Sequence, residues 1–277
     1  MEVAIVTDST ADLEVDILEK HDITMIPLQV TINDREYLDM VELKPEEFLA
    51  ELEDAEQMPT TSQPPLGKFI EVYEELATEY DYIISIHISG AMSGTVKTAN
   101  TASNMVEGAK IEVIDSQTVT IPLGVIVTEV ARAAQQGQSM EDLLDLITRL
   151  KEQVTIYFTV DELDYLEKGG RIGKATAFLG NLLKIRPLLT IEDSEIAPCK
   201  KIRGQRRLYK YFLKLAGQNR TSGSNNLIIL YGQYQDKAQT LREQLTARYD
   251  WDTVQAKRFG SVVGAHIGPT PYGMIIW

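Results

Sequence analysis

Two short segments rich in hydroxyl side chains are the part of the sequence best suited to binding chemistry. One is Thr60-Thr61-Ser62-Gln63-Pro64, and the other is Ser89-Gly90-Ala91-Met92-Ser93-Gly94-Thr95. Each precedes a stretch with helical periodicity, where first-turn N–H groups lack partners and the helix dipole is positive. Hydroxyl and N–H groups in this arrangement can hold a carboxylate or a phosphate without a cationic side chain. Ordinary N-capping by Ser and Thr is the alternative interpretation.

The three histidines and the single cysteine do not have the spacing of metal ligands. His21, His87 and His266 lie far apart, and none belongs to an H-x-x-x-H pattern. Cys199 has no second cysteine to pair with, so we expect neither a metal site nor an internal disulfide. We expect a structural or inert thiol, with a pKa lowered by the neighbouring Lys200 and Lys201 as the alternative.

His266 differs from the other histidines because glycines flank it. The segment Gly264-Ala265-His266-Ile267-Gly268-Pro269 predicts a loop from which an imidazole reaches a ligand or a neighbouring side chain. A neutral imidazole donates one hydrogen bond and accepts another, so it suits the orientation of a hydroxyl group or contact with a carboxylate. A structural role is the equal alternative. For His87, inside a predicted strand, we expect a hydrogen-bonded imidazole in the core.

A glycine-rich segment resembles phosphate-binding loops only loosely. Gly169-Gly170-Arg171-Ile172-Gly173 lacks both the G-x-x-x-x-G-K-[ST] pattern and a G-x-G-x-x-G after a strand. A helix C-cap explains the paired glycines, with Arg171 projecting toward an anion as the functional alternative. The sequence also lacks G-x-S-x-G, which disfavours a hydrolase with a nucleophile elbow.

Length and composition are those of an ordinary globular protein. A length of 277 residues favours two domains with separate cores. The chain is 44% apolar and 25% charged, which is typical of a globular protein. No apolar run reaches the roughly 18 residues that a membrane span needs. Because Met1-Glu2-Val3-Ala4-Ile5 leads directly into a strand-like run, we expect a cytoplasmic protein.

Charge is distributed unevenly along the chain. Residues 1 to 60 contain 17 acidic and 3 basic residues, and so account for the whole net charge of −14. Residues 199 to 220 contain eight basic residues and no acidic ones. A solvated helix face is the first interpretation, and a docking surface for an acidic partner protein is the second. Nucleic acid is disfavoured, since the rest of the chain would repel a polyanion.

The first half of the sequence alternates between strand-like and helix-like segments, which predicts an α/β fold with a parallel sheet. The expected strands cover residues 3–7, 24–32, 82–88 and 110–114, and the expected helices cover residues 12–20, 44–52, 64–78, 94–105, 120–136 and 140–153. Three strand ends are followed by small polar residues, at Asp8-Ser9-Thr10, at Ser89 with Ser93, and at Asp115-Ser116. Ligands bind at this edge of open α/β sheets.

The second half predicts an α+β domain. The expected elements are a strand at 155–160, a helix ending at Gly169-Gly170, a second helix through Phe178 to Ile185, a hairpin of 188–191 and 196–202, a basic helix, a strand at 226–231, a helix at 237–249, and strands at 254–258 and 273–277. We therefore predict an N-terminal α/β domain over residues 1–153 and a C-terminal α+β domain over residues 154–277.

Six short motifs, in order and at matching spacing, resemble the DegV family across essentially the whole chain. They are Thr7-Asp8-Ser9-Thr10-Ala11-Asp12-Leu13, Thr61-Ser62-Gln63-Pro64, Ser89 through Thr95, Asp115-Ser116, Leu163 through Gly173, and His266-Ile267-Gly268-Pro269. The two-domain build of that family agrees with the pattern above.

The resemblance implies a fatty-acid-binding protein, the non-catalytic, substrate-carrying subunit of a bacterial fatty acid kinase. A long-chain fatty acid would lie at the domain junction, where a separate kinase subunit phosphorylates its carboxylate to an acyl phosphate. ATP and Mg²⁺ would bind only to that kinase, and this chain would need no cofactor. Nucleic acid and stable membrane insertion are not implied, while transient membrane contact stays open.

The resemblance also implies roles for particular residues. Thr61 and Ser93 would contact the carboxylate with His266 nearby, Ser62 and Gly94 would complete the lipid site, and Arg203 would take part in kinase docking. Arg171 falls in a family motif without an assigned role. Two departures from the family pattern bear on these roles: Thr270-Pro271 follows the His266 motif, and Gly204 follows Arg203 where Thr is common.

Physical reasoning divides the expected binding between tail and head. Each buried methylene contributes about 0.8 kcal/mol, so the tail would dominate affinity. With no adjacent Lys or Arg expected at the carboxylate, its oxygen would stay available as a nucleophile. The apolar stretch Val119 to Val127 is a candidate for the tail tunnel, with a buried helix as the alternative. Two other functions stay open: an enzyme that uses His266 on a small carbonyl or phosphorylated substrate, and a nucleic-acid-binding regulator that uses residues 199 to 220.

Overall fold

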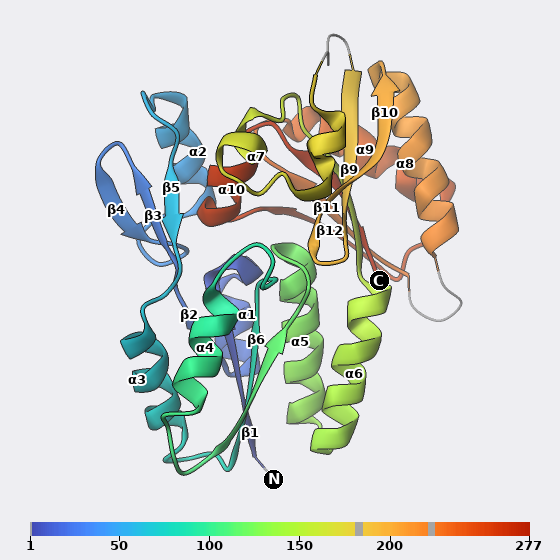
Figure 1. Cartoon of the computed structure of the whole chain (residues 1–277). Helices are drawn as coiled ribbons and strands as arrows, with labels where there is room; N and C mark the ends of the chain where they lie inside the picture. Colours follow the sequence, from blue (N-terminus) through green and yellow to red (C-terminus); the bar gives the residue numbers. More distant parts are fainter. Residues whose placement is uncertain (1, 181–184, 221–224) are drawn as a thin grey trace.

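Three β-sheets organise the described residues of the chain (Figure 1). The computed structural model describes residues 2–180, 185–220 and 225–277. A four-stranded sheet lies in the part that contains the N-terminus, a six-stranded sheet lies in the other part, and a three-stranded sheet lies beside the latter (Figure 1). Within the described residues, no helix is long and apolar enough to cross a membrane.

The four-stranded sheet is parallel throughout, as predicted. Across it, the strands are β2 (Ile23–Ile26), β1 (Val3–Asp8), β6 (Tyr82–His87) and β7 (Lys110–Asp115). Its helices are α1 (Val15–His21), α3 (Leu66–Leu76), α4 (Thr95–Ser103), α5 (Ile121–Gln135) and α6 (Met140–Gln153), with the 3-10 turn η1 (Ser9–Ala11) after β1.

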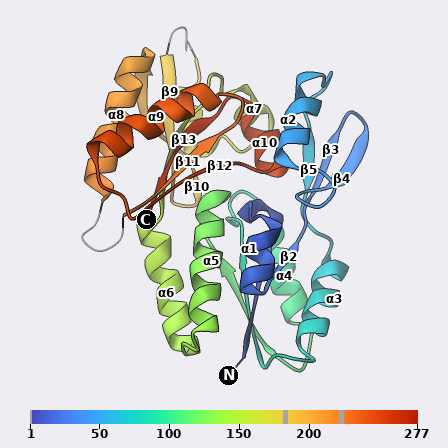
Figure 2. The ribbon, with the colours of Figure 1, turned by 180° about the vertical axis from the view of Figure 1, so that it is seen from behind.

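Alternation along the buried strands explains why helices cover both faces of this sheet. On β1, Ala4 and Val6 pack with Phe69 of α3, whereas Ile5 belongs to the cluster that contains Leu123 of α5. Figure 1 shows α3 and α4 on one face, and Figure 2 shows α1 and α5 on the other. A parallel sheet buried on both faces results.

The single strand expected over residues 24–32 is wrong. The chain leaves the parallel sheet after Ile26, and β3 (Gln29–Ile32) begins a second sheet with β4 (Arg35–Leu38) and β5 (Thr60–Ser62). Pro27 explains the break, because proline has no N–H to donate to a ladder. This small sheet and α2 (Pro45–Glu53) share a core with Val262 and Ala265, so they pack on the C-terminal half.

The six-stranded sheet is mixed. Across it, the strands are β10 (Glu195–Arg203), β9 (Ile185–Glu192), β8 (Thr155–Thr159), β13 (Tyr272–Ile276), β11 (Asn226–Tyr231) and β12 (Thr253–Arg258). Only the β11–β12 pair among these described strands is parallel. Helices α8 (Gln205–Asn219) and α9 (Gln235–Arg248) pack on one face through Phe212 and Leu241.

The second helix predicted for this half, through Phe178 to Ile185, is wrong, because neither Phe178 nor Ile185 lies in an α-helix. After α7 (Asp164–Lys168), a 3-10 helix, η2, spans Gly173–Phe178, and β9 begins at Ile185. Gly173 has a left-handed backbone, with φ of 51°, which interrupts regular α-helix. The remaining part of this prediction, residues 181–184, lies outside the described residues.

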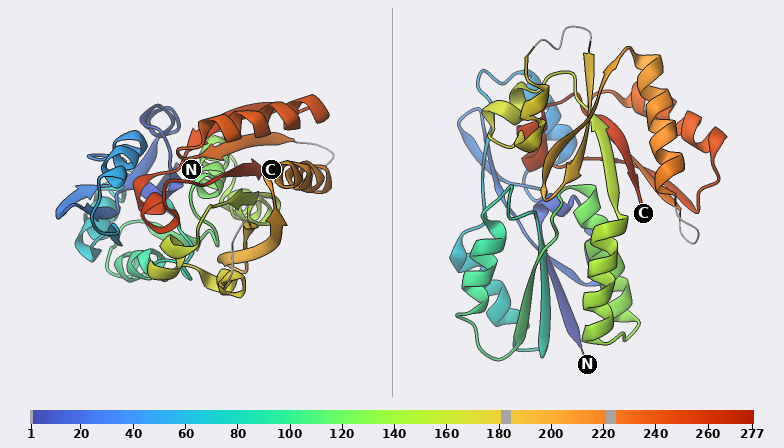
Figure 3. Two further views of the ribbon diagram at one scale, coloured as in Figure 1. Left: turned by 90° about the horizontal axis from the view of Figure 1, so that it is seen from above. Right: turned by 45° about the vertical axis from the view of Figure 1, so that its right-hand side comes forward.

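The other face of the six-stranded sheet looks toward the carboxyl edge of the parallel sheet (Figure 3). One apolar cluster joins Ile86 and Leu123 of the first half to Ile156, Ile196 and Ile275 of the second. The short helix α10 (Ser261–Ile267) lies between this sheet and the β3–β5 sheet. The predicted boundary at residue 153 stays a prediction, although α6 ends there and β8 begins at Thr155.

Candidate functional site

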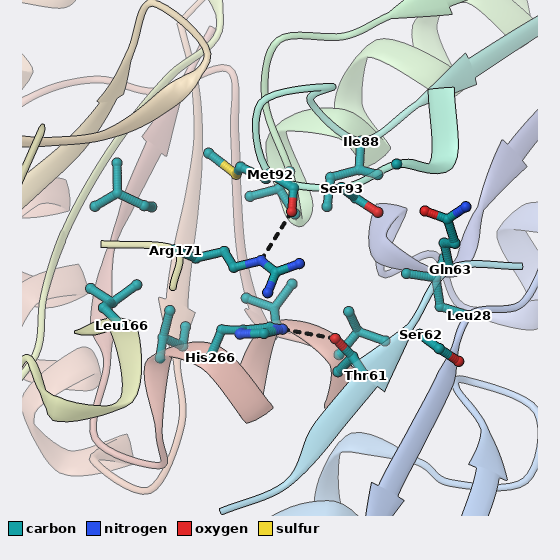
Figure 4. Close-up of a pocket in the computed structure, with 16 residues that line it drawn as sticks. Leu28, Thr61, Ser62, Gln63, Ile88, Met92, Ser93, Leu166, Arg171 and His266 are labelled. Carbon is teal, nitrogen blue, oxygen red and sulfur yellow. Dashed lines mark hydrogen bonds between the residues drawn. The ribbon is translucent and has the colours of Figure 1, made fainter. Parts of the chain in front are cut away.

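A cavity of about 300 Å³ lies where the two halves and the β3–β5 sheet meet (Figure 4). This volume is at the lower end of the range typical of small-molecule sites. Five predicted site residues line it: Thr61, Ser62, Ser93, Gly94 and His266. The other lining residues are Leu28, Gln63, Ile88, Met92, Val119, Leu166, Arg171, Ile196, Val262, Val263 and Ile267.

Thr61 lies on a strand, not in the loop that the sequence suggested. It pairs with Val30 as the middle residue of β5, which fixes its backbone against the small sheet. Its Oγ1 lies 2.8 Å from Nε2 of His266, a contact that Figure 4 shows as a dashed line. Two residues 205 positions apart thus form one polar edge of the cavity.

His266 also departs from the predicted loop, because it lies in the last turn of α10. Burial, followed by the positive charge of Arg171, lowers the pKa of His266 to about 4. The imidazole is therefore neutral at physiological pH. Its Nδ1 is buried, lies against Gly169 and has no hydrogen-bond partner among the described residues.

The partners of His266 indicate which ring nitrogen carries the proton. A proton on Nδ1 would leave a buried N–H without an acceptor, whereas a proton on Nε2 is donated to the Thr61 oxygen. We therefore assign the proton to Nε2. The Thr61 oxygen then accepts from His266, and its own O–H is free to donate to an anion in the cavity.

Hydroxyl contacts shape the segment Ser89 through Thr95. The N-cap residues of α4 and α3 are Gly94 and Pro65, and neither makes a side-chain cap bond, so the capping interpretation holds only for Ser93, which bonds a first-turn N–H of α4. Ser93 Oγ lies 2.8 Å from Thr95 Oγ1 and accepts the Thr95 N–H at 3.3 Å. This arrangement holds a hydroxyl group at the cavity wall beside the first turn of α4.

Gly94 lies where the two hydroxyl-rich segments meet. A Cβ at this position would lie 2.0 Å from Oε1 of Gln63, so a larger residue would displace the end of the Gln63 side chain. Gln63 Nε2 in turn donates to Thr98 Oγ1 on α4 at 2.6 Å. Ser62 contributes less, because its exposed hydroxyl donates to Gln29 Oε1 and points away from the cavity centre (Figure 4).

Arg171 lines the same cavity as the hydroxyl groups of Thr61 and Ser93, so the expectation of a polar end without a neighbouring Lys or Arg is wrong. Its side chain lines the same cavity, with Nε donating to Met92 O at 3.1 Å and Nη1 donating to Gly169 O at 2.9 Å. Its Nη2 has no hydrogen bond to a described residue, and the side chain is exposed at the rim. The glycine-flanked motif was the available signal, and the C-cap interpretation obscured it.

Most of the apolar lining had no signal in the sequence. Ile88, Leu166, Ile196 and Val263 come from four elements or connections, so only folding brings them together. Of the apolar stretch beginning at Val119, only Val119 lines the cavity, while α5 is the buried helix that was the alternative.

Arg203 is not part of this cavity. It ends β10, is exposed, and precedes Gly204, whose φ of 86° favours glycine at the N-cap of α8. Arg206, Arg207, Lys210 and Lys214 are also exposed on α8, which confirms the solvated basic helix face. For Cys199, burial outweighs the charge of Lys200 and raises the pKa of the thiol, which agrees with an inert thiol and not with the alternative of a lowered pKa.

His87 is the buried core imidazole that the sequence predicted. Its Nδ1 lies 2.9 Å from Asp8 Oδ2, and its Nε2 lies 2.6 Å from Ser85 Oγ. The order Asp, His, Ser matches a catalytic triad, but all three side chains are fully buried and Ser85 also accepts from Tyr73. A substrate has no access to this serine, so the network is structural. Within the described residues, no group of three or more His, Cys, Asp or Glu side chains is arranged to hold a metal ion.

Comparison with known proteins identifies the family. A family model described as "Uncharacterised protein, DegV family" matches residues 2–277. Protein DegV of Bacillus subtilis is 35% identical over 279 residues, covering 100% of this chain and 99% of the relative.

Two solved structures share the whole fold. A DegV family protein from Thermus thermophilus, described with fatty acid binding, superposes with a TM-score of 0.93 at 32% identity and covers 100% and 99% of the two chains. A stearic acid-binding protein from Eubacterium ventriosum gives a TM-score of 0.89 at 28% identity and covers 100% and 98%. The chain belongs to the DegV family.

Proposed function

We propose that this protein binds a long-chain fatty acid in the cavity and presents the carboxylate to a separate kinase. The observation that carries the proposal is one cavity with an apolar interior and, at its polar side, Thr61, Ser93, Arg171 and His266. The similar proteins from Thermus thermophilus and Eubacterium ventriosum are described as binding fatty acid, the latter stearic acid.

The head of the fatty acid would meet donors of two kinds. Thr61 and Ser93 supply hydroxyl groups, and Arg171 supplies a guanidinium with a nitrogen not bonded to any described residue. Hydrogen bonds to a charged group contribute about 1.5 to 3 kcal/mol each, which mainly offsets carboxylate desolvation. Because Arg171 is exposed, solvent weakens its ion pair and leaves a carboxylate oxygen accessible at the rim.

The tail would extend among Ile88, Val119, Leu166, Val263 and Ile267, which line the apolar part of the cavity. At about 0.8 kcal/mol per buried methylene, a long chain supplies most of the affinity. This division suits a carrier: the hydrocarbon retains the ligand while the carboxylate is positioned for reaction.

Phosphorylation of the carboxylate would use ATP and Mg²⁺ that are bound to the partner kinase. A carboxylate oxygen attacks the terminal phosphorus of ATP, the bond to the leaving ADP oxygen breaks, and an acyl phosphate results. This chain would contribute only orientation, and Arg203 with the exposed basic face of α8 would contact an acidic surface of the kinase. These roles, and a cytoplasmic location, follow from the family resemblance and agree with the charge distribution.

The properties of His266 favour a carrier over an enzyme that works alone. An imidazole with a pKa of about 4 is a weak base at neutral pH, and its Nδ1 faces Gly169 instead of the cavity. The nitrogen that faces the site is already bonded to Thr61. His266 therefore suits the orientation of a hydroxyl group better than proton abstraction or nucleophilic attack.

Native mass spectrometry of the purified chain tests this function directly. We expect a co-purifying long-chain fatty acid, and we expect Val263→Phe to reduce its occupancy because the larger ring fills the apolar cavity. Ser62→Ala is the matched control, since that hydroxyl bonds Gln29 and points away. Lipid-free protein that does not take up stearic acid, or that turns over a small substrate without a partner, would contradict the carrier function.

A further inference from the structure

Two aspartates that do not line the candidate cavity are buried beside the start of α10. Asp12 is 5% exposed and Asp39 is 0% exposed. Asp12 follows η1 in a left-handed conformation with φ of 51°, and Asp39 follows β4. Neither carboxyl group forms an ion pair with a described basic side chain. Because burial of an unpaired carboxylate is costly, this pair requires a physical explanation.

The partners of the two carboxyl groups converge on one turn of backbone. Asp39 Oδ1 accepts the Ser261 N–H at 3.1 Å, and Asp12 Oδ2 accepts the Thr120 O–H at 2.5 Å. The remaining oxygens, Asp12 Oδ1 and Asp39 Oδ2, have no well-aligned hydrogen-bond partner among the described residues, although the N–H groups of Gly260 and Val262 lie close enough to lower the two pKa values. A Cβ at Gly260 would lie 2.3 Å from Asp12 Oδ1, so both aspartates contact the Gly260-Ser261 start of α10.

The surrounding charges disfavour simultaneous ionisation of both groups. Burial, then the negative charge of Asp39, raises the pKa of Asp12 well above its ordinary value, while hydrogen bonds from Thr120 and Gly260 act in the opposite direction and Asp8 raises it further. Burial raises the pKa of Asp39 to about 6, against hydrogen bonds from Ser9, Ser261 and Val262 that lower it.

The basic groups on the neighbouring segments have other partners. Lys44 donates to Met40 O, and Arg258 on β12 pairs with Glu46. Lys257 and Arg132, which line a second cavity together with Asp12, pair with Glu14 and Glu129. His87 is bonded to Asp8. No described cation forms an ion pair with Asp12 or Asp39, and neighbouring buried carboxyl groups without such a partner retain a proton.

We propose that Asp12 and Asp39 hold one proton between them at neutral pH, with Asp12 as the acid and Asp39 as the carboxylate, and that this pair positions α10. A carboxylate is favoured beside the Ser261 N–H, where the helix dipole is positive. A protonated Asp12 removes the repulsion and supplies an O–H for one of the unpartnered oxygens. Since α10 carries His266, Asp39 is a positioning residue for the Thr61–His266 contact.

Two isosteric variants distinguish the acid from the carboxylate. Asp12→Asn replaces a neutral acid by a neutral amide of the same shape, and Asn tolerates the left-handed backbone. Asp39→Asn removes the charge beside Ser261. In lipid-free full-length protein at pH 7.5, we expect Asp12→Asn to keep the wild-type urea midpoint and His266 NMR shifts. Asp39→Asn should change both, and exposed Asp16→Asn on α1 is the control.

Carboxyl ¹³C NMR of aspartate-labelled protein reads the protonation states themselves. We expect a resonance at the position of a protonated acid at pH 7.5 that disappears in Asp12→Asn. Below about pH 6, protonation of Asp39 should shift the His266 signals of the wild type toward those of Asp39→Asn. An ionised Asp12 at neutral pH would overturn the proposal, as would unchanged His266 signals in Asp39→Asn. So would carboxyl signals that change with added Mg²⁺, Ca²⁺ or K⁺, because a bound cation would then replace the proton.

The effect on ligand release rests on the proposed function, whereas the protonation states do not. We expect stearic acid to dissociate several-fold faster from Asp39→Asn than from the wild type or from Asp12→Asn. If wild-type protein binds no fatty acid, the proposed function fails while the lipid-free NMR measurement still decides the carboxyl pair. If stearic acid binds but its release is the same in both variants, the positioning role of Asp39 is wrong and the proposed fatty acid binding is unaffected.

Discussion

Nε2 of His266 lies 2.8 Å from the hydroxyl oxygen of Thr61, and this contact joins α10 to the small β3–β5 sheet at the wall of the cavity. Because Nδ1 of the same ring has no partner in the part of the chain that the structure describes, the imidazole donates through Nε2 and directs the Thr61 proton away from itself. The Thr61 hydroxyl, which can both donate and accept, therefore accepts from His266 and keeps its own proton to donate to an anion.

Removal of this donor should affect reaction more than retention. In Thr61→Val and Ser93→Ala, loss of one hydrogen bond to a carboxylate, about 1.5 to 3 kcal/mol, should slow acyl phosphate formation about tenfold or more. Fatty acid affinity should change less, because the tail supplies most of it. The two quantities are the rate with the partner kinase and the dissociation constant of stearic acid.

Thr61→Ser keeps the hydroxyl group and is the matched control for the Thr61 variant. It should retain most of the wild-type rate. Equal losses of rate and affinity in Thr61→Val would contradict the prediction that contacts to the carboxylate mainly affect reaction while the tail mainly sets affinity.

Arg171 should make the site prefer an acid to an alcohol of equal chain length. In Arg171→Gln, we expect stearic acid to lose affinity by several-fold and up to about tenfold, the range for a partly solvated ion pair, while stearyl alcohol binds as before. The same substitution should raise the pKa of His266, since the guanidinium lowers it. Competition binding with both ligands measures the first effect, and histidine NMR measures the second. An unchanged acid-to-alcohol ratio would remove Arg171 from carboxylate recognition.

His266 should make the protein less stable in mild acid. Its folded-state pKa, about 4, lies below the unfolded value of about 6.5, so the unfolded chain binds the proton more tightly between these values. The stabilisation that comes from keeping His266 neutral is complete above pH 6.5. It is lost as pH falls toward 4, at up to roughly 1.4 kcal/mol per pH unit. Urea unfolding from pH 7.5 to 4.5 should show a steeper loss for the wild type than for His266→Gln. Parallel curves for the two proteins would contradict the shift.

Charge reversal at Arg203 should separate ligand uptake from kinase coupling. Arg203 is exposed at the end of β10, outside the cavity, so Arg203→Glu should leave stearic acid binding unchanged. If the basic face contacts an acidic surface, the same variant should reduce kinase-coupled turnover about tenfold at low salt and less at high salt. Lys110 is the first residue of β7, at the end of the parallel sheet away from its carboxyl edge. Lys110→Glu makes the same change in charge and should retain normal coupling. Normal coupling in Arg203→Glu as well would exclude docking at this residue.

Gly169 should be among the least replaceable glycines of the site. A Cβ there would lie 2.6 Å from His266 Nδ1 and 2.8 Å from Tyr165 O, so Gly169→Ala must displace the imidazole or the backbone. We expect a loss of about 1 to 3 kcal/mol and altered His266 NMR signals. Gly67→Ala, in open space on α3, should instead stabilise the chain by up to about 1 kcal/mol. Thermal unfolding of the two variants compares these effects, and a wild-type midpoint for Gly169→Ala would refute the close approach.

The parallel sheet was predictable because its signal is local. Buried strands such as Val3–Asp8 and Tyr82–His87 stand out as short apolar runs between amphipathic helices. The β3–β5 sheet was missed because its strands are short and pair across an intervening helix, so only tertiary contacts decide their place. The helical state of His266 was missed for a related reason: packing of Gly264 against Phe48 holds a glycine-rich segment in a helix that propensity disfavours.

The polar residues of the candidate site were easier to predict than its apolar lining. Thr61, Ser93 and His266 belong to motifs of distinctive composition, and the fold brings them to one cavity. Leu166 and Ile196 resemble any other core residue in sequence. The location of Arg171 depended on the direction in which a loop leaves α7, which Gly170 sets with its φ of 70°.

The excursion of the chain from Ile26 through β3, β4 and β5 and back to α3 has a consequence for folding. The cavity needs this excursion, the Ser89–Thr95 turn and α10 together, so it forms only when segments from Leu28 to Ile267 have come together. A partly folded chain therefore has no complete cavity. Any lipid that binds reports complete folding of the polypeptide and protects all of it, from the first strand to the last, against global unfolding.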